Sequence, residues 1–167
     1  GSQNISETDL NKIIETVKSD LSETIKLKKA TVECKELPAF HCNSLQFGQL
    51  LQNLISNALK FQKPGNHPRI VISHEMISGN MINNPMAISD KKYLKIEITD
   101  NGIGFEQEYE NKIFQMFYRL NGISEFPGTG MGLAICKKIV ENHNGFIAAK
   151  STPENGATFS CYFPVEH

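Results

Sequence analysis

The chain has 167 residues and a formal net charge of -1, with 40% hydrophobic and 21% charged residues. This composition is typical of one soluble globular domain that is long enough to bury a core. The near-neutral charge provides no broad basic field, and no apolar run reaches the roughly 18 residues of a membrane span, so we expect neither nucleic-acid binding nor direct membrane insertion.

The ends and the cysteines indicate a single domain in a reducing compartment. Gly1 and Ser2 have the letters of a cloning remnant, and we expect residues 3–167 to form the domain. The four cysteines are scattered and contain no C-x-x-C pair. This spacing is typical of reduced, buried thiols in a cytosolic protein and argues against a zinc site.

Apolar periodicity organises the first half of the chain. It predicts two helices and an intervening strand, namely a helix over 9–28, a strand over 31–37 and a helix over 43–61. Ser6 or Asp9 is expected to cap the first helix, and Asn43 or Ser44 the second. The segment KPGNHP then breaks the second helix.

The second half alternates strands with irregular segments. In order, we expect strands at RIVIS and YLKIEIT, an irregular aromatic-rich segment over 104–127, a helix over 132–144, and closing strands at GFIAAKS and ATFSCYF. The polar segment ISGNMINNPMAISDKK reads as a long hairpin loop. The order is not a regular βαβ alternation, so we expect an α+β two-layer sandwich, with helices on one face of a mixed, mostly antiparallel sheet.

Three polar residues of the second predicted helix share one stripe. Asn53, Asn57 and Lys60 fall within a narrow wedge beside the apolar face. An amide oxygen suits Mg²⁺ and an ammonium suits phosphate, so the stripe fits a metal–phosphate group. Taken alone, it fits a solvated helix flank better.

Two glycine clusters flank the aromatic-rich segment. Asp100 ends a strand just before the first cluster, where its carboxylate can accept a hydrogen bond from the amino group of a purine. The alternative is an Asp-Asn-Gly turn that closes a hairpin. The second cluster, GTGMG, leads into a helix and can form a phosphate-binding nest or a flexible hinge. Its spacing matches neither the P-loop nor the dinucleotide fingerprint.

Together these features describe one nucleotide site, with the aromatic-rich segment as a lid. Five segments resemble, in order, the N, G1, F, G2 and G3 boxes of the catalytic domain of sensor histidine kinases, namely LLQNLISNALKF, DNGIGF, IFQMFYRL, GTGMGLAICKKIVENHNG and GATFSCYF. The residues of the F and G2 boxes are similar to those of kinases linked to PAS or phytochrome sensors. The resemblance covers residues 43–163.

The resemblance implies the Bergerat ATP-binding fold, which is shared with gyrase, the mismatch-repair ATPases and a heat-shock chaperone ATPase. It implies that Asn57 holds Mg²⁺, Lys60 contacts phosphate, Asp100 accepts from the adenine amine and Arg119 reaches the γ-phosphate. Asn53, Asn57, Lys60 and Arg119 are the implied catalytic residues. The full implied ATP site comprises Asn53, Asn57, Lys60, Phe61, Asp100, Gly102, Ile103, Gly104, Phe114, Phe117, Arg119, Gly128, Thr129, Gly130, Met131, Gly132, Leu133 and Thr158.

The implied activity is phosphoryl transfer from Mg-ATP to a histidine on a separate dimerisation domain, with a response regulator downstream. His74-Glu75 has the letters of such an acceptor but closes a predicted strand, so we do not expect the chain to phosphorylate itself. Asn53 stands where hydrolysing members of the superfamily carry a glutamate base, so hydrolysis is expected to be slow. The resemblance also implies that this domain is cytoplasmic and monomeric. The parent kinase is expected to be dimeric, and it can be either soluble or membrane-anchored.

Two alternatives stay open. A degenerate nucleotide-sensing module would share the site, although the intact boxes argue against it. An anti-sigma serine kinase of the same superfamily is disfavoured by the F box. Three features depart from the resemblance, namely Asn144 in place of a glycine, Met131 in place of a leucine, and a loop over 77–91 that is longer than the family requires.

Overall fold

The computed structural model describes residues 4–115 and 132–165 of the chain. The described elements are β1 (Ile5–Asp9), α1 (Leu10–Asp20), α2 (Ser22–Leu27), β2 (Thr31–Cys34), β3 (Ala39–Asn43), α3 (Ser44–Lys60), β4 (Arg69–Ser78), η1 (Gly79–Met81), β5 (Lys92–Asp100), η2 (Gln107–Tyr109), α4 (Glu110–Ile113), α5 (Gly132–Asn142), β6 (Phe146–Ser151) and β7 (Ala157–Pro164). None of the helices in this part of the chain has the length and apolar character of a membrane span.

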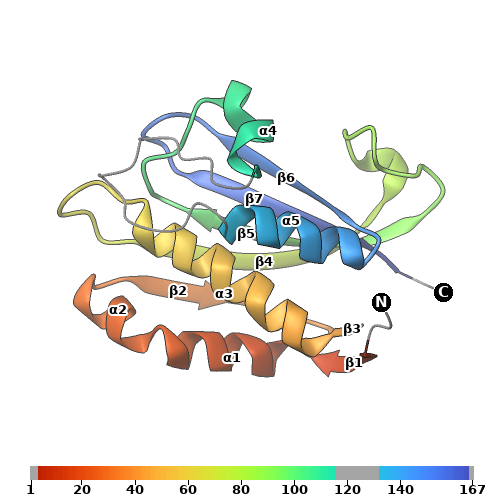
Figure 1. The fold of residues 1–167 in the computed structure, drawn as a ribbon, viewed down its shortest axis with the longest axis horizontal. Helices are drawn as coiled ribbons and strands as arrows, with labels where there is room; N and C mark the ends of the chain where they lie inside the picture. The colour runs from red at the N-terminus through yellow and green to blue at the C-terminus, as the bar shows by residue number, and fades with distance from the viewer. Residues whose placement is uncertain (1–3, 116–131, 166–167) are drawn as a thin grey trace.

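Five strands form the main sheet in the order β2-β4-β5-β7-β6, and β1 pairs with β3 in a separate two-stranded sheet. Only β2 and β4 run parallel, whereas the other neighbours in the main sheet are antiparallel. Helices α1, α3 and α5 form a layer against one face of this sheet (Figure 1). The predicted two-layer α+β sandwich is confirmed.

The core lies between the sheet and this helical layer. Alternate residues of the central strands point toward the helices and are buried, as the two-residue period of a strand requires. The buried core residues of β4, β5 and β7 are Ile70, Ile72, Tyr93, Leu94, Ile96, Ile98, Ala157, Phe159, Cys161 and Phe163. Tyr93 belongs to the opposite face, because the register pairs it with Ile77 and Pro164.

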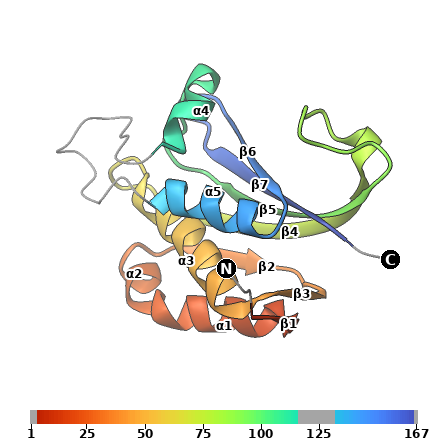
Figure 2. The same ribbon diagram turned by 45° about the vertical axis from the view of Figure 1, so that its right-hand side comes forward.

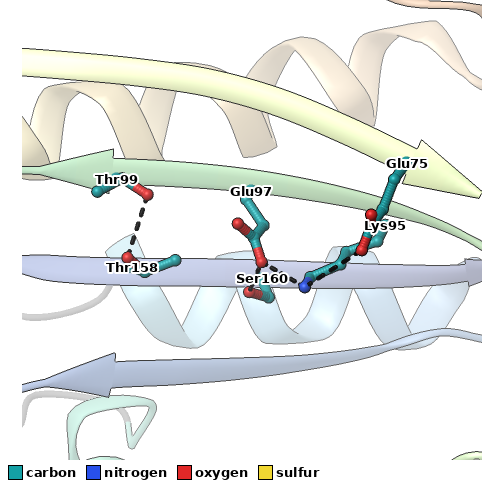
Figure 3. A network of polar contacts seen from close by, with 6 residues as sticks. All are labelled: Glu75, Lys95, Glu97, Thr99, Thr158 and Ser160. Atoms are coloured by element: carbon teal, nitrogen blue, oxygen red, sulfur yellow. Dashed lines mark hydrogen bonds and ion pairs between the residues drawn. The ribbon is translucent and has the colours of Figure 1, made fainter. Parts of the chain in front are cut away.

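The opposite face of the sheet carries polar residues. Lys95 on β5 is ion-paired with Glu97 and with Glu75 on the neighbouring strand. Ser160 on β7 donates a hydrogen bond to the same Glu97 carboxylate (Figure 3). The contrast between the two faces explains why the central strands alternate so clearly in the sequence.

Short polar links protect the free edge of β6. The side chain of Gln107 donates to the carbonyl of Ala149, and its oxygen accepts from the backbone N–H of Ser151. Glu110 on α4 accepts from the N–H of Ala149 at 2.9 Å. Unpaired edge groups are a template for aggregation, and these side chains occupy them.

Most predicted elements are observed with shifted ends. Asp9 caps α1 by accepting from the N–H of Asn11, and Asn43 caps α3 by accepting from Gln46. The single predicted helix over 9–28 is two helices that meet at Leu21. The strand predicted over 31–37 ends at Cys34, and the strand that begins at RIVIS continues to Ser78. Strands β1 and β3 were not predicted.

The long predicted loop is the tip of the β4–β5 hairpin. It projects from the end of the molecule that lies away from the C-terminal end of α3 (Figure 2). Gly79 packs against the backbone of Ile88, and the hydroxyl of Tyr93 accepts from the N–H of Ile88 at 3.0 Å. These contacts hold the loop against the end of the sheet.

The turn after α5 explains why Asn144 replaces a glycine without harm. Asn144 has a φ of 63°, which is the left-handed conformation that ends many helices. Asparagine tolerates this conformation better than other side chains do. The N–H of Gly145 then returns to the carbonyl of Val140 at 3.0 Å, so the helix closes normally.

Candidate nucleotide-binding site

Helix α3 presents the predicted polar stripe beside its buried face. Leu54 and Ala58 are buried against the core, whereas Asn53, Asn57 and Lys60 are half-buried. A half-buried side chain at such a boundary is held by its surroundings and still reaches a ligand. The structure therefore places the three stripe residues as the sequence predicts.

Asn53 links α3 to the beginning of α5. Its amide nitrogen donates to the carbonyl of Gly132, although the contact is long at 3.4 Å. One turn further along α5, the Cys136 thiol lies 3.8 Å from the carbonyl of Leu50 on α3 as a weak donor. The end of the second glycine cluster is thus brought to the helix that carries Asn57.

Asp100 ends β5 inside the sandwich. One of its carboxylate oxygens accepts from the N–H of Gly102 at 2.7 Å. Burial raises the pKa of Asp100 to about 6, and hydrogen bonds from the backbone N–H groups of Gly102 and Ala157 act in the opposite direction. The carboxyl group is therefore oriented by the backbone and titrates close to neutral pH.

The glycines after Asp100 are required by close backbone packing. A Cβ on Gly102 would collide with the carbonyl of Phe61 and lie 2.9 Å from the Asp100 carboxylate. Gly104 has a φ of 67°, and a Cβ there would collide with the carbonyl of Thr152. The first cluster thus packs against both the end of α3 and the 151–156 loop.

Two hydrogen bonds connect the end of α3 and the residues that follow it to the glycine-rich segment after β5. The N–H of Ile103 donates to the carbonyl of Phe61 at 3.0 Å. The side chain of Asn66 donates both to the oxygen of Gln62 and to the carbonyl of Asn101. As a result, the end of α3, near the predicted metal ligand, and the segment after Asp100, near the predicted adenine site, form one hydrogen-bonded corner.

The sequence motifs do not include the side chains that build this corner. Gln62 is buried and donates to the carbonyl of Ala58, which extends the end of α3. Asn101 accepts from the N–H of Arg69 and donates to the carbonyl of His67. The only sequence signal was an asparagine in a turn, where its side chain often bonds the backbone.

Thr158 lines the same pocket as Asp100, but its side chain lies on the opposite face of the sheet. Its hydroxyl is hydrogen-bonded to that of Thr99 at 3.1 Å on the polar face of the sheet (Figure 3). The residue paired with Asp100 is Ala157. Since successive strand residues point to opposite faces, the side chain of Thr158 lies opposite to that of Ala157, and its role in the ATP site stays a prediction.

The remaining predicted residues divide into two groups. Phe114 is buried and packs edge-on against Phe159, with ring centroids 6.1 Å apart. Leu133 is half-buried beside the core at the start of α5. The others lie outside the described residues, namely Phe117, Arg119, Gly128, Thr129, Gly130 and Met131.

The donor set fits a hard cation that is shared with phosphate. Among the described residues, no group of three or more His, Cys, Asp or Glu side chains is placed to hold a metal. The half-buried amide of Asn57 offers one oxygen instead. Mg²⁺ is commonly held by few protein ligands, with phosphates and water completing its shell, so this arrangement is compatible with it.

The sandwich and its glycine-lined corner define a class of ATP-binding domain. The catalytic domain of the histidine kinase ThkA has the same fold, with a TM-score of 0.74 and 25% identity over 97% of this chain and 98% of that one. Full-length ShkA in complex with AMPPNP matches with a TM-score of 0.77 over 98% of this chain and 32% of that one, and at 19% identity it shows the fold alone.

The sequence model for histidine kinase-, DNA gyrase B- and HSP90-like ATPases matches residues 42–167. The chain belongs to this family. It is similar to the phytochrome-like protein Cph1 of Synechocystis, with 34% identity over 95% of the chain, and to cyanobacterial phytochrome A of Nostoc, with 36% identity over the same share. The chain spans 19% of the length of each of these relatives. The predicted resemblance to phytochrome-linked sensor kinases is confirmed.

Proposed function

We propose that this ATPase domain binds Mg-ATP and transfers the γ-phosphoryl group to a histidine on a separate dimerisation domain. The observation that carries the proposal is the corner between β5 and α3. A half-buried carboxylate, oriented by Gly102, stands beside the end of a helix that carries Asn57 and Lys60. ShkA, which shares the fold, is described in complex with the ATP analogue AMPPNP.

Each residue has a role that follows from its chemistry. The Asp100 carboxylate accepts from the exocyclic amine of adenine, and Asn57 offers its amide oxygen to the metal. Lys60 places a positive charge toward the phosphates. Bound Mg²⁺ supplies charge neutralisation on the phosphate oxygens, which together with positioning is most of what phosphoryl transfer requires.

Asn53 favours transfer over hydrolysis. Its side chain is an amide that donates to the carbonyl of Gly132, so it has no basic group to take a proton from water. A neutral imidazole from a partner is already a nucleophile and needs no such base. We therefore propose that hydrolysis by this domain is slow compared with transfer to its partner.

Two of the described histidines, His74 and His143, are held in ways that do not suit a phosphoacceptor. His74 lies within β4, and its Nδ1 atom is buried without a partner among the described residues. His143 uses both ring nitrogens, because Nδ1 contacts the carbonyl of Ile139 at 2.8 Å and Nε2 accepts from the N–H of Asn43. These placements support an acceptor outside this domain.

The proposed setting is two-component signalling, with a dimeric parent kinase and a response regulator downstream. ThkA, a structural neighbour with 24% identity and a TM-score of 0.70, is described in complex with the response regulator TrrA. The buried cysteines Cys42, Cys136 and Cys161 are free thiols. Free thiols fit a reducing cytoplasm, where ATP is available.

Radiolabelled ATP tests the proposal directly. The domain alone should stay essentially unlabelled, whereas addition of the dimerisation domain of its own parent should label a histidine of that domain. The product should be a phosphoramidate, which is labile in acid and stable in alkali. An acid-stable phosphoserine would instead identify an anti-sigma-type kinase. ATP binding without any transfer to the correct partner would identify a nucleotide sensor.

A further inference from the structure

The segment that follows α3 is a tight turn that returns the chain to the helix. The N–H of Asn66 donates to the carbonyl of Lys63 at 3.0 Å, and Gly65 has a φ of 80°. A proline at the second position and a glycine with positive φ at the third are typical of a type II turn, and Pro64 and Gly65 occupy these positions. The residues that end α3 thus also bring the side chain of Asn66 back to that of Gln62.

Two side-chain amides then connect α3 to the segment after β5. Gln62 is buried, and its Nε2 donates to the carbonyl of Ala58 at 2.9 Å. Its Oε1 accepts from Nδ2 of Asn66 at 2.6 Å, and the same nitrogen donates to the backbone carbonyl of Asn101 at 3.2 Å. The Gln62 and Asn66 side chains are called the amide bridge below.

The orientation of both amides is fixed by the carbonyls at the two ends of the bridge. A backbone carbonyl only accepts hydrogen bonds, so Ala58 requires the nitrogen of Gln62. The oxygen of Gln62 then faces Asn66, which must present its own nitrogen. The carbonyl of Asn101 requires that same nitrogen. Neither amide can therefore flip without losing a hydrogen bond, and the bridge holds one geometry.

The bridge meets the segment after β5 next to Gly102. Asn101 lies between Asp100 and Gly102, and on the other side the N–H of Ile103 donates to the carbonyl of Phe61 at 3.0 Å. One hydrogen bond would let this segment pivot, whereas bonds on both sides of Gly102 fix its direction. The direction matters because the N–H of Gly102 orients the Asp100 carboxylate, at 2.7 Å.

We propose that the amide bridge is a positioning element of the ATP site, in which Gln62 and Asn66 hold the carboxylate of Asp100 in the direction that favours adenine. The two residues act through the backbone on either side of Asp100 and Gly102 and have no proposed contact with the nucleotide. The inference rests on the proposed function, because it needs Asp100 to read the base.

The test is the ratio of the affinities for ATP and inosine triphosphate, measured by calorimetry with magnesium. Inosine triphosphate presents a carbonyl where ATP has an amine. Asn66→Ala removes the donor of two hydrogen bonds and should lower the ratio by about three- to tenfold, because a carboxylate that can turn discriminates less between the two groups. A merely structural loss would weaken both nucleotides equally and leave the ratio unchanged.

Two further variants identify the bridge as the cause. Gln62→Met removes the amide, keeps a similar volume and should lower the ratio to the same extent. Because the two side chains act as one unit, the double variant should be no lower than the lower single variant. Asn66→Asp keeps the size of the side chain but replaces the donor by an acceptor, so it should not restore the ratio of the parent.

Asn84→Ala is the matched control. The side chain of Asn84 also bonds the backbone in a turn, since it accepts from the N–H of Met86 at 2.9 Å, but it lies in the loop between β4 and β5. This variant removes a comparable hydrogen bond and should keep the ratio of the parent. Thermal unfolding without nucleotide shows which variants are folded, and if one bridge variant fails to fold, the other carries the same test.

Each outcome decides a different question. An unchanged ratio in folded Asn66→Ala or Gln62→Met would overturn the positioning role, as would an equal fall in Asn84→Ala. A parent protein that binds both nucleotides equally would also overturn it, while the proposed binding of Mg-ATP would stand. A parent protein that binds neither nucleotide would overturn the proposed function and the inference together.

Discussion

The carboxylate of Asp100 accepts a 2.7 Å hydrogen bond from the N–H of Gly102, and Gly102 itself packs against the carbonyl of Phe61. Phe61 is the C-cap residue of α3. The group proposed to read adenine is therefore fixed, through a single glycine, to the helix proposed to hold the metal. A change at either end of the site should be felt at the other.

The first prediction concerns stability and pH. The pKa of Asp100 is raised from 3.8 to about 6 by burial, so the folded protein binds this proton more tightly than the unfolded chain. Its contribution to the free energy of unfolding is therefore fully present below about pH 3.8 and is lost as the pH rises through about 6. The loss should be at most about 3 kcal/mol.

Urea denaturation of the parent and of Asp100→Asn at several pH values measures this contribution. Asparagine keeps the oxygen that accepts from Gly102 and does not titrate. The difference between the two proteins cancels the other carboxylates, and it should shift in favour of Asp100→Asn between about pH 4 and pH 7. A difference in the free energy of unfolding that is constant over this pH range would show that burial does not raise the pKa of Asp100.

The second prediction concerns the choice of base. ATP offers an amine to Asp100, whereas ITP differs by presenting a carbonyl at the same position. The parent should prefer ATP, and Asp100→Asn should reduce ATP affinity by about 1–3 kcal/mol because one hydrogen-bonding partner is reversed. The asparagine amide can donate to a carbonyl, so this variant should also narrow the gap between ATP and ITP. Calorimetry measures both, and equal affinity of the parent for the two nucleotides would contradict the assignment.

The third prediction compares two glycines. A Cβ on Gly102 would collide with the carbonyl of Phe61, whereas a Cβ on Gly48, in the second turn of α3, would meet nothing within 4 Å. Gly48→Ala should therefore stabilise the fold by about 0.5–1 kcal/mol, because it removes unfolded-state freedom within a helix. Gly102→Ala should destabilise it by about 1–3 kcal/mol through overpacking. Chemical denaturation that ranks the two variants in the reverse order would show that the corner is looser than described.

The elements that could be predicted from sequence carry strong local signals. Helix α3 has an N-cap asparagine and a continuous buried face, and β5 alternates cleanly from Leu94 to Ile98. Strands β1 and β3 lack such signals, because each has five residues and only one of them is buried. Their pairing joins Ile5–Asp9 to Ala39–Asn43, and no local pattern predicts a contact between segments so far apart in the sequence.

In the site too, local motifs predict which residues lie near it but not where their side chains point. The motifs identified Asp100 and the α3 stripe, because those residues occupy an element's end or one side of a helix. They did not identify the direction of Thr158, which depends on how β7 is paired with β5. Nor did they identify the contact of Asn53 with the carbonyl of Gly132, which arises only when two distant helices pack together.

The last prediction concerns the metal. Asn57→Ala removes the amide oxygen assigned to Mg²⁺ and leaves a half-buried helix position that alanine fills well. ATP affinity should become nearly independent of magnesium, and phosphoryl transfer to the partner domain should fall below detection, while thermal unfolding stays close to that of the parent. Gln49→Ala is the matched control, because it removes a similar amide from an exposed position of the same helix. It should leave the magnesium dependence unchanged. Calorimetry with and without magnesium distinguishes the two variants, and an Asn57→Ala protein that keeps the parent's magnesium dependence would make Asn57 a structural residue of α3.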